Sequence, residues 1–167
     1  MILVSDTSVL IDLERGGLLE ALFALPHEFA VPDVLYDHEM QGDWGDGLVR
    51  LGLRVEEVSK EGVANALRYR LQRATLSVPD SFALALAKER QWLLLTGDGQ
   101  LRDLAGGEDV ECHGVLWLLD MMEEAGTPAI QSLHDGLTAL AAHPRCRLPR
   151  REITIRIERY RITIEGK

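Results

Sequence analysis

The segment MILVSD at residues 1–6 is an apolar run that ends in an aspartate, and WLLLTGD at residues 92–98 repeats the pattern. Neither run alternates apolar with polar residues, which indicates strands covered on both faces, as in a parallel sheet. Each strand therefore directs a carboxylate, Asp6 or Asp98, out of its carboxyl end. A third run, LSVPD at residues 76–80, also ends in an aspartate.

The carboxyl edge of an open α/β sheet is where ligands usually bind, beside the point at which the strand order reverses. Carboxylates gathered at that edge repel one another unless a hard cation such as Mg²⁺ or Mn²⁺ neutralises them. The three runs therefore predict a metal site.

Length and composition favour one domain. The chain has 167 residues, 46% of them hydrophobic, enough for one full core. We expect a main domain at residues 1–145 and a basic extension at residues 146–167 that packs on the same domain. No apolar run is long enough to span a bilayer and the chain begins directly with a strand, so we expect a cytoplasmic protein without a membrane anchor. Cys112 and Cys146 have neither CxxC spacing nor a zinc pattern and are expected to be free thiols.

The net charge of −9 is unevenly distributed. Residues 145–167 hold eight Lys or Arg and three Glu, a net charge of +5, whereas residues 1–144 hold ten basic and 24 acidic side chains, a net charge of −14. An acidic body repels a polyanion, so nucleic-acid binding would depend on local patches and metal ions. The sequence leaves two interpretations of the basic tail open: a solvated or docked helix face, or a contact for RNA.

Apolar runs alternate with helical patterns along the chain, which predicts an α/β fold with three layers (α/β/α) and a central, mostly parallel sheet. Further strands are expected at residues 29–31, 51–58 and 110–112. Helices are expected at residues 9–14, 18–23, 32–40, 60–73, 77–90, 99–105, 114–122 and 129–142. The glycine-rich segment 42–47 is expected to be a loop.

Two helical patterns need a separate argument. Val63, Leu67 and Leu71 recur at i, i+4 and i+8 of the 60–73 helix, the spacing of a face that packs on a core. In the tail, the apolar residues of segment 153–164 fit a helical stripe better than an alternating strand, although their β-branched side chains favour a strand. We expect a helix there.

Four blocks of the sequence resemble the four acidic motifs of the PIN domain family. The blocks are VSDTSVLI at residues 4–11, the Val31-Pro32 helix start with Asp37 and Glu39, PDSFALALA at residues 79–87, and LLTGD at residues 94–98. Their order and spacing are more specific than any one block. The resemblance covers roughly residues 1–125 and implies a PIN-like fold and a metal-dependent endoribonuclease, similar to the VapC-type toxins of toxin–antitoxin pairs.

The resemblance also implies site residues. In the family the second acid is usually a glutamate in the helix after the second strand; here the aligned position falls near His38, and the neighbouring Glu39 matches the motif best, with Asp37 as the alternative. The residues expected to bind Mg²⁺ or Mn²⁺ and to act in catalysis are Asp6, Glu39, Asp80 and Asp98.

The implied reaction is hydrolysis of a phosphodiester bond in single-stranded or looped RNA, the form whose backbone is most accessible. RNA is the expected substrate and an antitoxin protein the expected partner. Hydroxyls next to the acids could orient a carboxylate; they belong to Thr7, Ser8 and Thr96. Candidate phosphate contacts are Arg68, Arg70, Arg73 and Arg102.

Each acid also has an ordinary explanation. Asp6 and Asp98 can be helix N-caps, Asp80 lies three residues after Ser77 in a capping arrangement, and Glu39 can be a solvated helix residue. The alternative function is therefore a catalytically degenerate PIN-fold module that binds a protein partner or RNA. A different magnesium phosphohydrolase is disfavoured, because the segment after the first strand lacks the second aspartate of a DxD motif.

The helix at residues 114–122 is apolar nearly all round, with Leu116, Trp117, Leu119, Met121 and Met122. Such a helix must be covered on more than one side, and a homodimer through this helix is expected. The alternative is that the 129–142 helix and the tail cover it within one chain.

Overall fold

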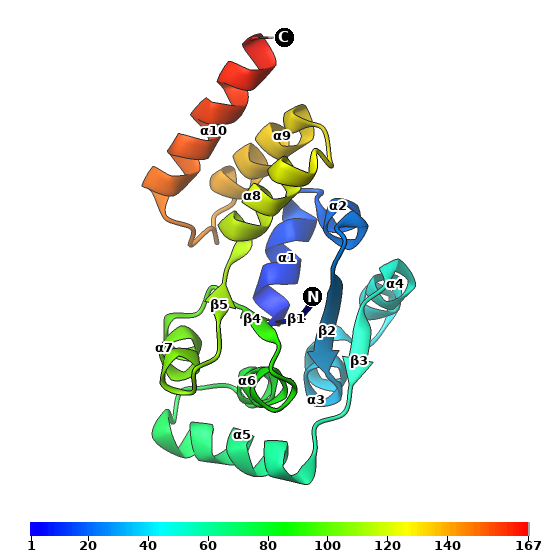
Figure 1. Cartoon of the computed structure of the whole chain (residues 1–167), viewed down its shortest axis with the longest axis vertical. Coiled ribbons are helices and arrows are strands. Elements are labelled where there is room, and N and C mark those ends of the chain that lie inside the picture. Colours follow the sequence, from blue (N-terminus) through cyan, green and yellow to red (C-terminus); the bar gives the residue numbers. More distant parts are fainter. Residues whose placement is uncertain (167) are drawn as a thin grey trace.

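The computed structural model describes residues 1–166 and contains one five-stranded parallel sheet in the order β3-β2-β1-β4-β5 (Figure 1). The strands are β1 (Ile2–Ser5), β2 (Glu28–Pro32), β3 (Arg54–Glu56), β4 (Leu93–Leu95) and β5 (Cys112–His113). The register places Leu3 of the central strand β1 opposite Phe29 on one side and Leu93 on the other. The strand order reverses between β1 and β4, which is where the sequence predicted a ligand site.

Helices cover both faces of the sheet. They are α1 (Thr7–Arg15), α2 (Leu19–Ala24), α3 (Asp33–Leu35), α4 (Asp43–Leu51), α5 (Lys60–Gln72), α6 (Val78–Arg90), α7 (Gly99–Gly107), α8 (Val115–Ala125), α9 (Ile130–Ala142) and α10 (Arg150–Glu165), and α3 continues directly into a π-helical turn, η1 (Tyr36–Met40). Helices α1, α2, α8 and α9 pack together on one face, and α3, α5, α6 and α7 lie on the other (Figure 1). The predicted three-layer α/β/α architecture is confirmed.

The prediction of a loop at residues 42–47 is wrong, because most of this segment belongs to α4. Gly42 takes the left-handed backbone conformation, with φ of 109°, that separates α4 from the preceding turn. Leu48 is buried, and Gly45 lies so close to Met40 that a Cβ atom would be 2.1 Å from the Met40 carbonyl oxygen. The glycine at position 45 therefore serves close packing within a helix, and not chain reversal.

The apolar stripe of α5 does not face the core. Val63, Leu67 and Leu71 are 37%, 55% and 88% exposed. The buried side consists of Gly62, Ala66 and Tyr69. The small side chains of Gly62 and Ala66 permit the close approach of α5 to α6, and Tyr69 is the large side chain that α5 buries. The strand expected at residues 110–112 begins two residues later in the structure, where β5 is Cys112–His113.

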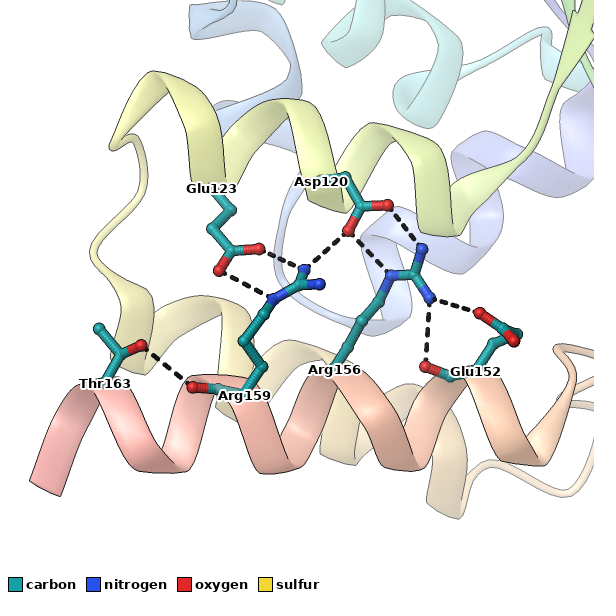
Figure 2. Close-up of polar contacts among 6 residues, drawn as sticks. All are labelled: Asp120, Glu123, Glu152, Arg156, Arg159 and Thr163. Atoms are coloured by element: carbon teal, nitrogen blue, oxygen red, sulfur yellow. Dashed lines mark hydrogen bonds and ion pairs between the residues drawn. The ribbon is translucent and has the colours of Figure 1, made fainter.

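The tail is helical as expected, and ion pairs attach it to α8 (Figure 2). Arg156 donates to both carboxylate oxygens of Asp120, at 2.9 and 2.5 Å, and Arg159 donates to Asp120 and to Glu123. On the same side of α10, Ile153 and Tyr160 are buried. This apolar and ionic anchoring explains why a segment rich in β-branched residues is a helix.

Helix α8 is covered mainly within the chain. It contacts α1, α2 and α9, and its ion pairs link it to α10. Leu119 and Met122 are buried, whereas Leu116, Trp117 and Met121 are partly exposed. The surface left for the expected homodimer interface is therefore smaller than the sequence suggests, and the dimer stays a prediction. None of the helices within residues 1–166 combines the length and apolar character needed to cross a membrane.

Gly45→Ala should destabilise the fold by about 1–3 kcal/mol, the usual range for an overpacked contact, because the added Cβ would collide with the Met40 backbone. Gly47→Ala is the matched control on the same helix. The nearest atom to its added Cβ is 3.8 Å away, on the flexible Arg50 side chain, so this change should raise the stability by about 0.5–1 kcal/mol through helix propensity. Urea unfolding followed by circular dichroism measures both, and equal effects would contradict the packing argument.

Candidate metal centre

Asp6 lies at the carboxyl end of the central strand and is only 2% exposed. Its Oδ1 atom accepts hydrogen bonds from the Val9 backbone N–H at 2.9 Å and from the Ser8 hydroxyl at 3.0 Å, so Asp6 is the N-cap of α1. Its Oδ2 atom accepts a hydrogen bond from the Thr96 hydroxyl at 2.6 Å. Burial raises the pKa of Asp6 against the opposing effect of these hydrogen bonds, and the nearby Asp98 carboxylate raises it further.

Thr96 joins the first and the fourth acid. It is fully buried after β4, where its hydroxyl donates to Asp6 and accepts from the Asp98 backbone N–H at 3.0 Å. Asp98 in turn caps α7, because its Oδ1 atom accepts from the Leu101 N–H at 2.8 Å. The expectation that Thr96 orients a carboxylate is confirmed. The capping roles of Asp6 and Asp98 are also confirmed, so each of these aspartates caps a helix and lies at the carboxyl edge of the sheet.

Glu39 and Asp37 both lie on the π-helical turn η1, and the two side chains have different partners. Glu39 is exposed and accepts a hydrogen bond from the Thr7 hydroxyl, one residue after Asp6. Asp37 is exposed and accepts a hydrogen bond from the Gln41 amide at 3.2 Å, on its own helix. The structure thus brings Glu39, and not Asp37, to the end of β1. His38 is exposed and makes no side-chain hydrogen bond within residues 1–166.

Asp80 lies in the first turn of α6, where its N–H donates to the Ser77 hydroxyl at 3.1 Å. Its pKa is raised to about 6, first by burial and then by the Asp6 carboxylate, with Glu39 and Asp98 adding smaller contributions. The four acids come from four separate segments of the chain, and the other three all contribute to the raised pKa of Asp80. Their shared role at one metal site stays a prediction.

The donor chemistry of this cluster suits a hard divalent cation, because all four side chains offer carboxylate oxygens. A cation would also reduce the mutual repulsion that raises the pKa of Asp80. Within residues 1–166, however, no group of three acidic, histidine or cysteine side chains is arranged so that it could hold one metal ion. Asp6 and Asp98 instead direct oxygens to helix N–H groups. The cluster fits a cation in composition and charge, and its side chains do not converge on a single point.

Of the four arginines expected to contact phosphate, Arg102 is the one that contacts a residue of the acidic edge within residues 1–166. Its guanidinium donates to the Thr96 carbonyl at 2.9 Å. Arg68 pairs with Glu108 and Arg70 donates to the Leu76 carbonyl, and Arg73 is exposed. Two surface hollows, of about 660 and 620 Å³, lie at the amino ends of β1 and β4 and between α8, α9 and α10. The acidic edge lies outside both of them.

A PIN domain model matches residues 2–161, nearly the whole chain. The chain belongs to the PIN domain family. PIN domains are generally nucleases that use divalent metal ions, so the family agrees with the chemistry of the acidic edge. The resemblance inferred from the four acidic blocks is confirmed at the level of the family.

A solved PIN-like structure has the same fold. It is a PilT N-terminus domain protein from the hyperthermophilic archaeon Sulfolobus solfataricus P2, with a TM-score of 0.53, 18% sequence identity, and an alignment that covers 74% of this chain and 95% of that one. At this identity the likeness concerns the fold alone. No curated protein matches the sequence significantly.

The ion pairs that hold α10 on α8 were not predicted from the sequence. Asp120 and Glu123 on α8 are three residues apart, and so are their partners Arg156 and Arg159 on α10. This matched spacing of acids and arginines is visible in the sequence and could have indicated the pairing of the two helices.

Asp80→Asn should stabilise the protein at pH 7.5 in buffer that contains EDTA. The folded-state pKa of Asp80 is raised to about 6 from an ordinary value of 3.8. The folded protein therefore binds this proton more tightly than the unfolded chain, and stability falls as the pH rises from about 4 to about 6. The substitution should add about 1–2 kcal/mol at pH 7.5, allowing for solvent screening of a partly exposed group, and almost nothing near pH 4.

Urea unfolding at both pH values measures this difference. Asp103→Asn is the control, because Asp103 is exposed on α7 and makes no side-chain hydrogen bond or ion pair within residues 1–166. A gain in stability that is the same at both pH values, or equal for the two variants, would contradict the burial and charge repulsion assigned to Asp80.

Proposed function

We propose that this protein is a metal-dependent endoribonuclease that hydrolyses phosphodiester bonds in single-stranded or looped RNA. Its metal-binding and catalytic residues are Asp6, Glu39, Asp80 and Asp98. The observation that carries the proposal is the arrangement of the acids at the carboxyl edge, where Thr96 is hydrogen-bonded to both Asp6 and Asp98 and Thr7, next to Asp6, donates to Glu39. The raised pKa of Asp80, caused first by burial and then by the other three carboxylates, supports it. Groups with strongly perturbed pKa values gather at functional sites more often than elsewhere. Family membership supports the same reaction class.

The residues of the proposed site have different roles. A divalent cation held by the four carboxylates would acidify the attacking water and neutralise charge on the phosphate. Asp6 is the rigid member, because three hydrogen bonds and burial hold it. Glu39 is the exposed member, with Thr7 as its hydrogen-bond partner. Arg102, next to Thr96, is placed to contact a phosphate oxygen.

Further parts of the proposal concern the cell and the assembly. We infer a cytoplasmic toxin of a toxin–antitoxin pair, with a small antitoxin protein as partner; an antitoxin-like reading frame next to the gene would support this role. We infer a homodimer through the partly exposed side of α8, formed by Leu116, Trp117 and Met121. We also propose that residues 146–167 are an extension of the single domain at residues 1–145. The last residue, Lys167, lies outside the described part of the chain.

The second candidate is a PIN-fold module without catalysis that binds RNA or a protein partner. The observation that favours it is the arrangement of the acids, since within residues 1–166 no three of them converge on one point. The two candidates differ in one measurable property, which is cleavage of RNA in Mn²⁺ that stops in EDTA.

Asp6→Asn, Asp80→Asn and Asp98→Asn, each tested alone, should abolish Mn²⁺-dependent cleavage and leave the fold intact. Asparagine caps a helix as well as aspartate does, so the changes at the two caps remove a charge but keep the cap hydrogen bond. At Asp6 the amide also loses the oxygen that accepts from Thr96, so Asp80→Asn and Asp98→Asn carry the test if circular dichroism shows that Asp6→Asn is misfolded. Cleavage of a single-stranded RNA and circular dichroism on the same samples measure both properties. Asp103→Asn is again the control. Variants that cleave RNA like the parent protein would contradict the proposal that these acids form one catalytic site.

Glu39→Gln should reduce metal affinity and cleavage more than Asp37→Asn does. Glu39 is held at the end of β1 by Thr7, whereas Asp37 pairs within its own turn. We expect Glu39→Gln to cost at least the roughly 10- to 100-fold that loss of an outer-shell partner costs at metal sites. Calorimetric titration with Mn²⁺ and cleavage rates provide the comparison. A larger effect at Asp37 would reassign the second acid.

A further inference from the structure

The arginines of the tail fall into two sets. Arg156 and Arg159 pair with acids of α8, and Arg161 pairs with Glu158 on its own helix. The other set, here called the arginine group, comprises Arg145, Arg147, Arg150 and Arg151. All four are exposed, and none forms a side-chain hydrogen bond or ion pair with another part of residues 1–166. Docking of the tail onto the rest of the chain therefore accounts for the paired arginines and leaves the arginine group unexplained.

The position of the arginine group is not explained by stability. Arg150 and Arg151 are the first two residues of α10, where the helix dipole disfavours cations. The N-cap is Pro149, which offers no side-chain hydrogen bond to the first turn. Two unpaired arginines at this place destabilise the helix, so a function outside the fold is the better explanation.

The ion pairs fix where the arginine group lies. Asp120 pairs with Arg156 and Glu123 with Arg159, so α8 and α10 run in the same direction with a constant offset in numbering (Figure 2). The same offset places Arg150, the start of α10, level with the start of α8.

The start of α8 is close to the acidic edge. It follows β5 directly, and the carbonyl of His113 in β5 accepts a hydrogen bond from Thr96, the residue that holds Asp6. With usual spacings of strands and packed helices, the arginine group lies on the order of 20 Å from Asp6. An RNA strand of modest length spans this distance.

Charge also favours an RNA partner. Residues 1–144 carry a net charge of −14, so the acidic body itself repels a polyanion. Four unpaired arginines within seven residues supply a local attraction. The segment has few exposed apolar side chains, since Cys146 and Leu148 are partly buried, whereas the centre of a protein–protein interface is usually apolar and aromatic. Phosphate groups are the partner that this composition fits.

We propose that the arginine group binds backbone phosphates of the RNA strand whose scissile bond lies at the carboxylates. The identity of the polyanion as RNA rests on the proposed function. The contacts are to phosphates, so they position the strand without reading its sequence. The arginine group thus supplies the affinity for RNA that the acidic edge of the sheet lacks.

The test measures binding of a fluorescent 20-nucleotide single-stranded RNA to the full chain in EDTA, over a range of salt concentrations. Arg150→Gln/Arg151→Gln should weaken binding about 10-fold at low salt and reduce the salt slope, log Kd against log salt concentration, by about 1.4, because each phosphate contact on a single strand contributes about 0.7. The loop variant Arg145→Gln/Arg147→Gln should act alike, and it remains informative if the helix variant misfolds by circular dichroism.

The matched control is Arg50→Gln/Lys60→Gln. It removes two exposed charges from α4 and α5, neither of which is paired within residues 1–166, and it should leave the slope unchanged. An unchanged slope in both arginine-group variants, or an equal loss in the control, would overturn the inference. Cleavage is measured separately in Mn²⁺. If the parent protein binds RNA through the arginine group but does not cleave it, the nuclease proposal fails and the RNA contact stands.

Discussion

The buried carboxylate of Asp6 is the constraint around which the rest of the site is arranged. A carboxylate taken from water without partners is costly, and this one is compensated by donors from two places. The start of α1 supplies Val9 and Ser8, and the end of β4 supplies Thr96. The hydrogen bond from Thr96 joins segments 90 residues apart at the point where the strand order reverses. Satisfying one buried charge thus fixes the relative positions of β1, β4 and α7.

At two of the four acids, the proposed role in the site coincides with an observed structural role. Asp6 and Asp98 cap helices, and the same backbone geometry places their carboxylates at the carboxyl edge. The remaining two acids are presented differently. Asp80 occupies the first turn of α6, and Glu39 projects from a π-helical turn, a type of turn that is frequent at functional sites. Burial and the neighbouring carboxylates, Asp6 first among them, raise the pKa of Asp80.

The C-terminal helix shows how one basic segment can serve two purposes. Arg156 and Arg159 hold α10 on α8 through ion pairs with Asp120 and Glu123, and these pairs neutralise the charge of the two arginines. The docking in turn positions the unpaired arginines at the start of α10. In the sequence, docking and RNA contact were alternatives for the whole tail. In the structure they are compatible, because they use different arginines.

The sequence by itself determined the parts of this protein that depend on local chemistry. Continuous apolar runs determined β1 and β4, and Asp6, Ser77 and Asp98 began helices because a short polar side chain can accept from the exposed N–H groups of a first turn. The order and spacing of the four acidic blocks also sufficed to identify the family.

Only the tertiary structure decided the features that depend on what a segment packs against. Position 45 requires a glycine because Met40 approaches it closely, and α5 buries Ala66 and leaves Leu67 exposed where it packs against α6. The partner of Glu39 is 32 residues away in Thr7, and the partners of Arg156 lie on another helix. Periodicity in a sequence shows that a helix has two faces, but the neighbouring elements select which face is buried and which charges are neutralised.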